Sequence, residues 1–541
     1  MVATGSPEAT EAAVQILEKG GNAIDAAIAA ALTLGVVDFD ASGIGGATSM
    51  VIHLASGQTL AVDGTSRAPM VIDIDRFREF KKSGRTYGYE TVAVPTTLAV
   101  LEHARDRYGS MDMATLFGPA IEFAERGYPL SKIQIKWTHV YYDAIVESSS
   151  YMSLLSMEDG RTIGTEGDHN CRPDLANTYR QIAARGVRDF YRGNIADAIE
   201  ADMIRGGGFL RKSDLVALRI RESRPLHTNY RGFDVYTLPP PGGGAGVIAI
   251  LNILENYPSD FLAQDSPERH HTFIEAFRIA EIDASMVSSR LASPGVNPLS
   301  KSHARDRTTL IVQGKAIPEE TLAPSLDPAC RSQGESTTQV SIADNLGNVV
   351  SLTQTLSRSF GAKVATRGLG FPYNSFLEYF NADKPQCPGY LQPYSPCPTD
   401  MAPTIVLEDG RLYAALGSPG SVMIPRVVSE VVSNMVDRDL GIRDAVSAPR
   451  VLWGGRLWMR FWIELAGPFT DADVHAFEQM GFGPGTVVRF PAPDDPGDTT
   501  LTNLGGVNAV GWSVDTKTYV GVGDSRRYGS AKGPRVVVDH E

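Results

Sequence analysis

A run of hydroxyl-bearing residues is the part of this sequence best suited to chemistry. Residues 335–341 have the sequence ESTTQVS, and Thr337 opens an alternating segment. A threonine hydroxyl is a weak nucleophile near neutral pH and needs a base within hydrogen-bond reach. Cleavage of the peptide bond before Thr337 would free an α-amine with a pKa of roughly 7.7–8.0, which can serve as that base. The alternative is that these threonines only begin a β-strand.

The bulk composition narrows the classes of partner. The chain has 541 residues, 43% of them hydrophobic and 21% charged, and a net charge of −13. An acidic surface argues against nucleic acid or an anionic membrane as the main partner. The sequence has no apolar run of about 18 residues, and its first residues lack the basic and apolar regions of a secretion signal. We expect a cytoplasmic protein that acts on a small molecule, unless a leader has been removed.

Neither the cysteines nor the histidines have the spacing of a metal site. The four cysteines lack the close pairs of a zinc site, and the ten histidines show no HExxH spacing. No metal or organic cofactor is expected. Cys387 and Cys397 flank a loop rich in proline and tyrosine and are candidates for a disulfide, although free or buried thiols are the favoured alternative.

The elements that must position Thr337 form blocks of strands and helices. Helices are expected at 7–19 and 23–31, with Asn22 as the N-cap of the second. Residues 90–230 are expected to be mainly helical and 293–335 a loop. Paired strands are expected at 50–54 with 59–62, 338–343 with 349–355, 404–407 with 412–416, and 507–514 with 519–522, and a helix at 424–437. Such blocks predict stacked layers, with sheets packed between helices.

A family resemblance covers nearly the whole chain. Residues 337–361 resemble the start of the small subunit in γ-glutamyltransferases. Further motifs follow the family's order and spacing: GGNAIDAA at 20–27, SGIGG at 42–46, VP at 94–95, FYRG at 190–193, PPPGGG at 239–244, EAFR at 275–278, APTI at 402–405, GSPG at 417–420, APR at 448–450 and GDSRR at 523–527. Each motif is weak alone, but together they are specific.

The resemblance implies an α+β fold, namely the four-layer αββα sandwich of N-terminal-nucleophile hydrolases. It also implies that the chain is a zymogen that cleaves itself between Ser336 and Thr337. The products would be a large subunit, 1–336, and a small subunit, 337–541, which pair as a heterodimer.

Three further catalytic residues come from the resemblance. Thr355 matches the threonine that hydrogen-bonds the nucleophile, whereas the plain alternative is an inward-facing strand residue. Gly420 and Ser421 match the family's oxyanion loop, in which backbone N–H groups stabilise a tetrahedral intermediate; the alternative is an ordinary Pro-Gly turn. The family has glycine at the position of Ser421, and a serine fits there if its φ is negative.

The residues that would bind the substrate carboxylate depart from the family. Thr65 stands where the family has an arginine. Arg67, two residues later, either replaces that cation or is a solvated charge. The family's serine pair is Thr399 and Asp400 here, and an aspartate would repel a carboxylate. Ser357 is a further candidate for substrate binding.

The residues that would bind the substrate ammonium also differ. The family's acidic residue is replaced by Tyr379, which follows Glu378. Phe376 replaces a nearby glutamine, and Gln339 occupies a position that is often histidine. Losing a bidentate arginine–carboxylate contact should move the substrate preference. Either Glu378 or Asp400 could still receive an amine.

The function predicted is transfer or hydrolysis of an acyl group through a threonine acyl-enzyme. Substrates would be γ-glutamyl amides such as glutathione, or related acyl amides. One alternative is an acylase, or a biosynthetic enzyme of the same fold that breaks a C–C bond in a non-glutamyl substrate. Another is an inactive binding or scaffold homologue.

Overall fold

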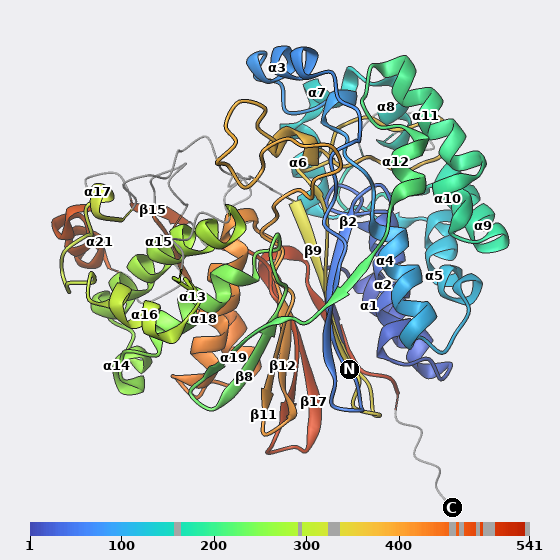
Figure 1. Cartoon of the computed structure of the whole chain (residues 1–541). Helices are drawn as coiled ribbons and strands as arrows, with labels where there is room; N and C mark the ends of the chain where they lie inside the picture. Colours follow the sequence, from blue (N-terminus) through green and yellow to red (C-terminus); the bar gives the residue numbers. More distant parts are fainter. Residues whose placement is uncertain are drawn as a thin grey trace, which may run out of the picture.

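A computed structural model describes residues 1–155, 164–289, 295–322, 336–453, 461–464, 470–482, 487–490 and 504–535. Two large sheets lie face to face, and helices cover the outer face of each (Figure 1). The architecture is thus the four-layer αββα sandwich that the resemblance implies.

The first sheet carries Thr337. Its seven strands are all antiparallel to their neighbours, in the order β18-β1-β9-β10-β2-β3-β6. Their bounds are Ser530–Lys532, Val2–Thr4, Ser336–Ala343, Val349–Ser357, Ala47–His53, Thr59–Asp63 and Arg221–Ser223. Every residue of β9 and β10 is buried, because other layers cover both faces of this hairpin.

The second sheet packs against the first. Its six strands are also antiparallel and follow the order β17-β16-β12-β11-β8-β7. Their bounds are Thr518–Gly523, Asn508–Ser513, Arg411–Gly417, Thr404–Glu408, Phe233–Thr237 and Leu226–Tyr230. Two small sheets lie apart from it: β13 (Val451–Trp453), β14 (Phe461–Glu464) and β15 (Val487–Phe490), and the pair β4 (Tyr128–Pro129) and β5 (His169–Asn170).

Helix α2 is central to the helical layer on the first sheet. It spans Ala23–Val37, is buried on every side and contacts β9 and β10. A helix that is apolar all round is typical of a core position. Asn22 and Asp25 form a capping box that fixes its start. The other helices before the second sheet are α1 (Pro7–Glu18), α3 (Ile74–Lys82), α4 (Thr97–Tyr108), α5 (Met113–Arg126), α6 (Lys132–Val140), α7 (Tyr142–Val146), α8 (Ser149–Leu155), α9 (Pro173–Arg185), α10 (Arg188–Arg192), α11 (Asn194–Gly206) and α12 (Lys212–Ala217).

The second helical layer covers the opposite outer face (Figure 1). Its helices are α13 (Gly244–Leu254), α14 (Ser259–Ala263), α15 (Pro267–Ser289), α16 (Lys301–Thr308), α17 (Glu319–Leu322), α18 (Ile424–Val436), α19 (Ile442–Ser447) and α21 (Asp471–Phe477). The buried apolar residues form three clusters, one under each helical layer and one between the sheets. The middle cluster includes Ala47, Val51, Ile405, Ala415 and Val510.

Most element predictions are confirmed. The four expected strand pairs form, and Asn22 caps the second helix, which runs on to Val37 rather than ending at residue 31. The loop predicted at 293–335 is wrong within its described part, since α16 and α17 lie there. Helix α16 buries only Ala304 and so shows no apolar periodicity, while Ser300 caps its start.

Candidate active site

Thr337 is the second residue of β9, near the centre of the first sheet. In the uncut chain its side chain is only 5% exposed. The pairing of β9 with β10 is irregular between Gln354 and Ser357, so that Ser336 lies opposite Ser357. Irregularities of this kind are common beside active sites, because they re-aim a side chain or end the pairing.

Thr355 contacts the peptide bond that the resemblance marks for cleavage. Its hydroxyl donates a hydrogen bond to the carbonyl oxygen of Ser336, and it accepts one from the backbone N–H of Ser357 at 2.8 Å. A hydroxyl on the carbonyl oxygen draws electron density from the carbonyl carbon and stabilises negative charge that develops there. The uncut chain therefore already holds a donor on the bond before Thr337.

A small pocket brings together seven of the eleven predicted site residues. It is lined by Thr337, Thr355, Ser357, Phe376, Tyr379, Pro398, Thr399, Asp400, Met401, Ser421 and Ile424. Its volume is about 20 Å³, which is room for roughly one water molecule. Ser357 donates to the phenol oxygen of Tyr379 at 2.6 Å. The pocket of the uncut chain is therefore too small for an amide substrate.

Three predicted substrate residues lie off this pocket. Arg67 is half-buried, with its guanidinium 5.8 Å from the ring centre of Tyr394. Glu378 pairs with Arg358, at 2.7 Å between Oε1 and Nε. Thr65 is buried, and its hydroxyl has no hydrogen-bond partner among the described residues. Their roles in substrate binding remain predictions.

The predicted oxyanion loop connects β12 to α18. Gly420 and Ser421 both have positive φ, +129° and +57°, and a short 3-10 turn, η4 (Ser421–Met423), leads into the helix. The backbone N–H groups at this helix start favour negative charge. The condition under which a serine fits this position, a negative φ, is therefore not met. The serine occupies the left-handed region, where glycine is the relaxed residue.

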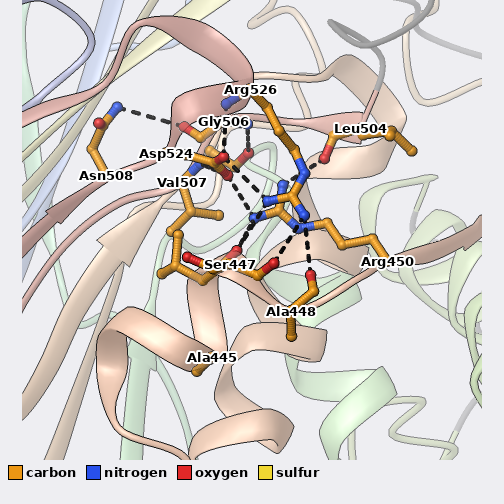
Figure 2. Close-up of polar contacts among 12 residues, drawn as sticks. Ala445, Ser447, Ala448, Arg450, Leu504, Gly506, Val507, Asn508, Asp524 and Arg526 are labelled. Atoms are coloured by element: carbon orange, nitrogen blue, oxygen red, sulfur yellow. Dashed lines mark hydrogen bonds and ion pairs between the residues drawn. The ribbon is translucent and has the colours of Figure 1, made fainter. Parts of the chain in front are cut away.

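A buried ion network holds the segment around Gly506, which contacts this loop (Figure 2). Asp524 lies between Arg450 and Arg526, at 2.6 Å and 3.2 Å, and also accepts from the N–H of Val507. Arg450 donates to the carbonyl of Leu504 at 2.7 Å. Burial alone would raise the pKa of Asp524, but the two arginines and backbone N–H groups hold it below its ordinary value.

That network reaches the oxyanion loop through one further bond. The N–H of Gly506 donates to the hydroxyl of Ser418 at 3.0 Å, in the segment that Arg450 and Asp524 hold. The APR and GDSRR motifs thus serve a positioning role. Gln339 lies two residues after Thr337 and is also buried. Its amide donates hydrogen bonds to the hydroxyls of Ser341 and Ser351, which joins β9 to β10.

Asp400 is the one acidic side chain on the small pocket. Burial raises its pKa to about 7, Arg426 opposes that rise, and Glu281 adds to it. The side chain is therefore largely neutral in mildly acidic solution and charged in mildly alkaline solution. In its neutral form it can donate a hydrogen bond to an acyl group.

Replacement of Asp400 by asparagine is expected to stabilise the protein increasingly as pH rises. The folded wild type keeps a proton that the unfolded chain, with a pKa near 3.9, has lost, so its stability falls between about pH 4 and pH 7. Asparagine does not titrate. The stability gain should grow by about 2.6 kcal/mol between pH 5 and pH 8. Urea unfolding in an uncut Thr337→Ala background measures it. Asp515→Asn, at an exposed turn, is the control substitution. A difference for Asp400→Asn that does not change with pH would contradict the assignment.

A second, larger cavity lies beside Thr337. Its volume is about 320 Å³, and Ser336, Thr337 and Thr338 all line it. The charged residues on its wall are Glu8, Asp38, Asp40, Glu166 and Arg527. Sequence reasoning missed Asp38 and Asp40, because no local signal links these residues, just after helix α2, to Thr337.

The cysteine prediction is resolved in part. Cys387 is disulfide-bonded, whereas Cys397 is a free, buried thiol, so these two do not pair. The Sγ of Cys397 lies 3.5 Å from the carbonyl oxygen of Phe376. Within the described ranges, no cluster of three or more potential metal ligands occurs and no helix is long and apolar enough to cross a membrane.

Two packed antiparallel sheets between helical layers are the fold of the N-terminal-nucleophile hydrolase class. Residues 9–533 match the sequence profile of the gamma-glutamyltranspeptidase family, so the chain belongs to this enzyme family. The predicted family and fold class are confirmed.

Relatives fall in two groups by name. A glutathione hydrolase proenzyme of Pseudomonas sp. (strain A14) is 34% identical over 472 residues, covering 83% of this chain and 80% of the relative. The acylase ACY 1 proenzyme of Pseudomonas sp. (strain V22) is 31% identical over 536 residues, covering 95% and 90%. The crystal structure of cephalosporin acylase from Bacillus halodurans superposes with a TM-score of 0.85 at 26% identity, covering 99% of this chain and 96% of that one.

Proposed function

We propose that the chain cleaves its own Ser336–Thr337 bond and then uses Thr337 to hydrolyse or transfer the acyl group of small amides. The observation that carries the proposal is the hydroxyl of Thr355 on the carbonyl oxygen of Ser336. That contact prepares this peptide bond for attack by the hydroxyl of the next residue. Both relatives are named as proenzymes, which supports the proposal that this chain is a precursor that is cut.

The cleavage proceeds as an acyl shift followed by hydrolysis. Oγ of Thr337 attacks the carbonyl carbon of Ser336, the C–N bond breaks, and the proton of the hydroxyl passes to the leaving nitrogen. Water then hydrolyses the resulting ester, which leaves a carboxylate on Ser336 and a free hydroxyl and amine on Thr337. In turnover that amine accepts the hydroxyl proton, and an acyl-enzyme forms and is released to water or an amine.

Thr355→Val is expected to slow self-cleavage. The variant loses the donor on the scissile carbonyl but keeps the shape of the side chain, and loss of one such donor costs about 10²–10³ in rate. Intact-mass spectrometry over time after a translation pulse measures the rate. Thr353→Val is the matched control, because that hydroxyl donates to Gln339 at 2.7 Å instead. Equal rates for the two variants would show that the Thr355 contact does not act on the bond.

The pocket favours an acyl group without the α-amino acid end of a γ-glutamyl group. The family's carboxylate-binding arginine is replaced by Thr65, and Arg67 lies off the pocket beside Tyr394. The family's ammonium-binding acid is replaced by Tyr379, whose phenol bonds Ser357. The exposed surface of the pocket is mainly apolar. We therefore favour the acylase branch of the prediction.

Three anilides that differ only in their acyl group test this preference. We expect glutaryl and butyryl anilides to have a higher kcat/KM than γ-glutamyl anilide, by about tenfold, which is 1.4 kcal/mol of differential binding. Glutathione, followed by mass spectrometry, serves as a fourth substrate. A γ-glutamyl anilide that leads the series, with kcat of roughly 1 s⁻¹ or above, would contradict the preference. Cleaved protein that turns over none of the four would contradict the amide reaction itself.

A further inference from the structure

Self-cleavage, on which this inference rests, lacks the base that later turnover has. Before cleavage the nitrogen of Thr337 belongs to a peptide bond and is not basic. A threonine hydroxyl attacks slowly unless a nearby group accepts its proton. The uncut chain must therefore use a different base from the mature enzyme.

The turn after α2 places two carboxyl groups on the cavity that Thr337 lines. Asp38 is the C-cap residue of α2, and Asp40 follows two residues later. The carbonyl oxygen of Asp40 accepts from the hydroxyl of Ser336 at 3.2 Å and from the N–H of Phe360 at 2.7 Å. The turn is thus fixed directly to the residue whose carbonyl is attacked.

A further bond ties the turn to the strand that carries the carbonyl donor. The carbonyl of Ala41 accepts from the N–H of Leu356 at 2.9 Å, next to Thr355. The backbone of the turn is therefore hydrogen-bonded to both strands of the hairpin, β9 through Ser336 and β10 through Leu356. The cavity, at about 320 Å³, has room for several water molecules.

The two carboxyl groups are held in a state suited to proton transfer. Asp40 is 2% exposed, and its Oδ1 has no hydrogen-bond partner among the described residues. Burial raises the pKa of Asp40, while its own backbone N–H, Arg527 and Gln134 oppose the rise. Burial and Asp40 raise the pKa of Asp38, which also bonds the hydroxyl of Thr338. General bases work best with a pKa moved toward working pH.

The charges that face this pair are few. Arg527 is partly buried and lowers the pKa of both carboxyl groups, and its own pKa is lowered to about 10 by desolvation. The remaining titratable groups around the pair are Tyr128, Tyr151, Arg172, Glu8, Glu166 and Tyr528. Asp38 and Asp40 are thus two carboxyl groups with one close cation. Since two neighbouring carboxylates repel each other, the pair can share one proton.

We propose that Asp40, paired with Asp38, is the base that starts self-cleavage. Through a water molecule in the cavity it takes the proton of Oγ as that oxygen bonds to the carbonyl carbon of Ser336. It then returns a proton to the nitrogen of Thr337 as the C–N bond breaks. After cleavage the freed amine takes over, so Asp40 has no part in turnover.

The test is a comparison of maturation with turnover. Full-length wild type, Asp40→Asn, Asp40→Glu and Glu8→Gln are made in a cell-free translation pulse and followed by intact mass. Asp40→Asn should slow cleavage by about 10²–10⁴, the usual contribution of a general base, and Asp40→Glu should restore part of it. Glu8→Gln, on the wall of the same cavity, should cleave as wild type does. Turnover per cleaved site should be equal in all four.

A rescue experiment separates a chemical from a structural role. Asp40→Ala leaves space in the cavity, so added formate should speed its cleavage in proportion to the formate concentration, while wild type should not respond. Cleavage of Asp40→Asn at the wild-type rate would overturn the proposal. So would an equal loss of cleavage and turnover, or a slow Asp40→Ala variant that formate leaves unchanged.

These outcomes are distinct from failure of the proposed function. If wild type stays intact, or if Thr337→Ala is cut, self-cleavage at Thr337 is wrong and the base has no reaction to serve. If wild type is cut, Thr337→Ala is not, and Asp40→Asn matches wild type, only the base is wrong.

Discussion

Thr337→Ala is expected to give a chain that stays at its full length of 541 residues and has no measurable amide turnover. The variant lacks the oxygen that attacks both the Ser336 carbonyl and the substrate. Removing a nucleophile of this kind costs on the order of 10⁶ in kcat. Intact mass measures the first effect, and the release of aniline from an acyl anilide measures the second.

Thr337→Ser is the matched variant. It keeps the hydroxyl and the α-amine and loses only a methyl group, so it should be cut and should turn over at a reduced rate. A Thr337→Ala chain that is cut at Ser336 would show that another group attacks this bond. An uncut Thr337→Ala chain that still hydrolyses anilides would place the nucleophile elsewhere.

Asp524→Asn is expected to have the largest effect on stability. The substitution leaves Arg450 and Arg526 buried with no carboxylate between them, in the network that holds residues 504–508 behind the oxyanion loop. Breaking one partner of a buried ion network costs about 3–5 kcal/mol. Urea unfolding of the uncut Thr337→Ala chain, with and without Asp524→Asn, measures the loss.

An exposed ion pair provides the control for that prediction. Asp383 pairs with Arg78 at 2.8 Å, and the two side chains are 66% and 41% exposed. Asp383→Asn should therefore cost no more than about 1 kcal/mol. Equal losses from the two substitutions would show that the Arg450–Asp524–Arg526 network does not depend on its charge.

The hairpin that carries Thr337 could be predicted from the sequence, because alternation and turn chemistry are local signals. Motifs that keep their spacing predicted Thr355 and the loop at 417–421 as site residues, and Thr355 and Ser421 line one pocket with Thr337. The φ of Ser421 was out of reach, since a positive φ at a non-glycine residue depends on how the loop packs against Gly505. Helix α16 was missed because a helix that buries one alanine has no apolar period.

The residues predicted to bind substrate fall into two groups, those that line the small pocket and those that lie off it. Tyr379, Thr399 and Asp400 line the small pocket together with Thr337. Arg67 has the right charge in the right part of the sequence, but the direction of a long side chain is set by tertiary neighbours, here Tyr394. The acidic pair beside Thr337 meets it only through folding, across about 300 residues of chain, which no local pattern encodes.

N-terminal sequencing of the purified protein tests the central claim most directly. The account predicts two polypeptides, and the smaller one begins Thr-Thr-Gln-Val with a free α-amine at Thr337. A protein that shows only the N-terminus of the intact chain, or a new terminus at another residue, would contradict it.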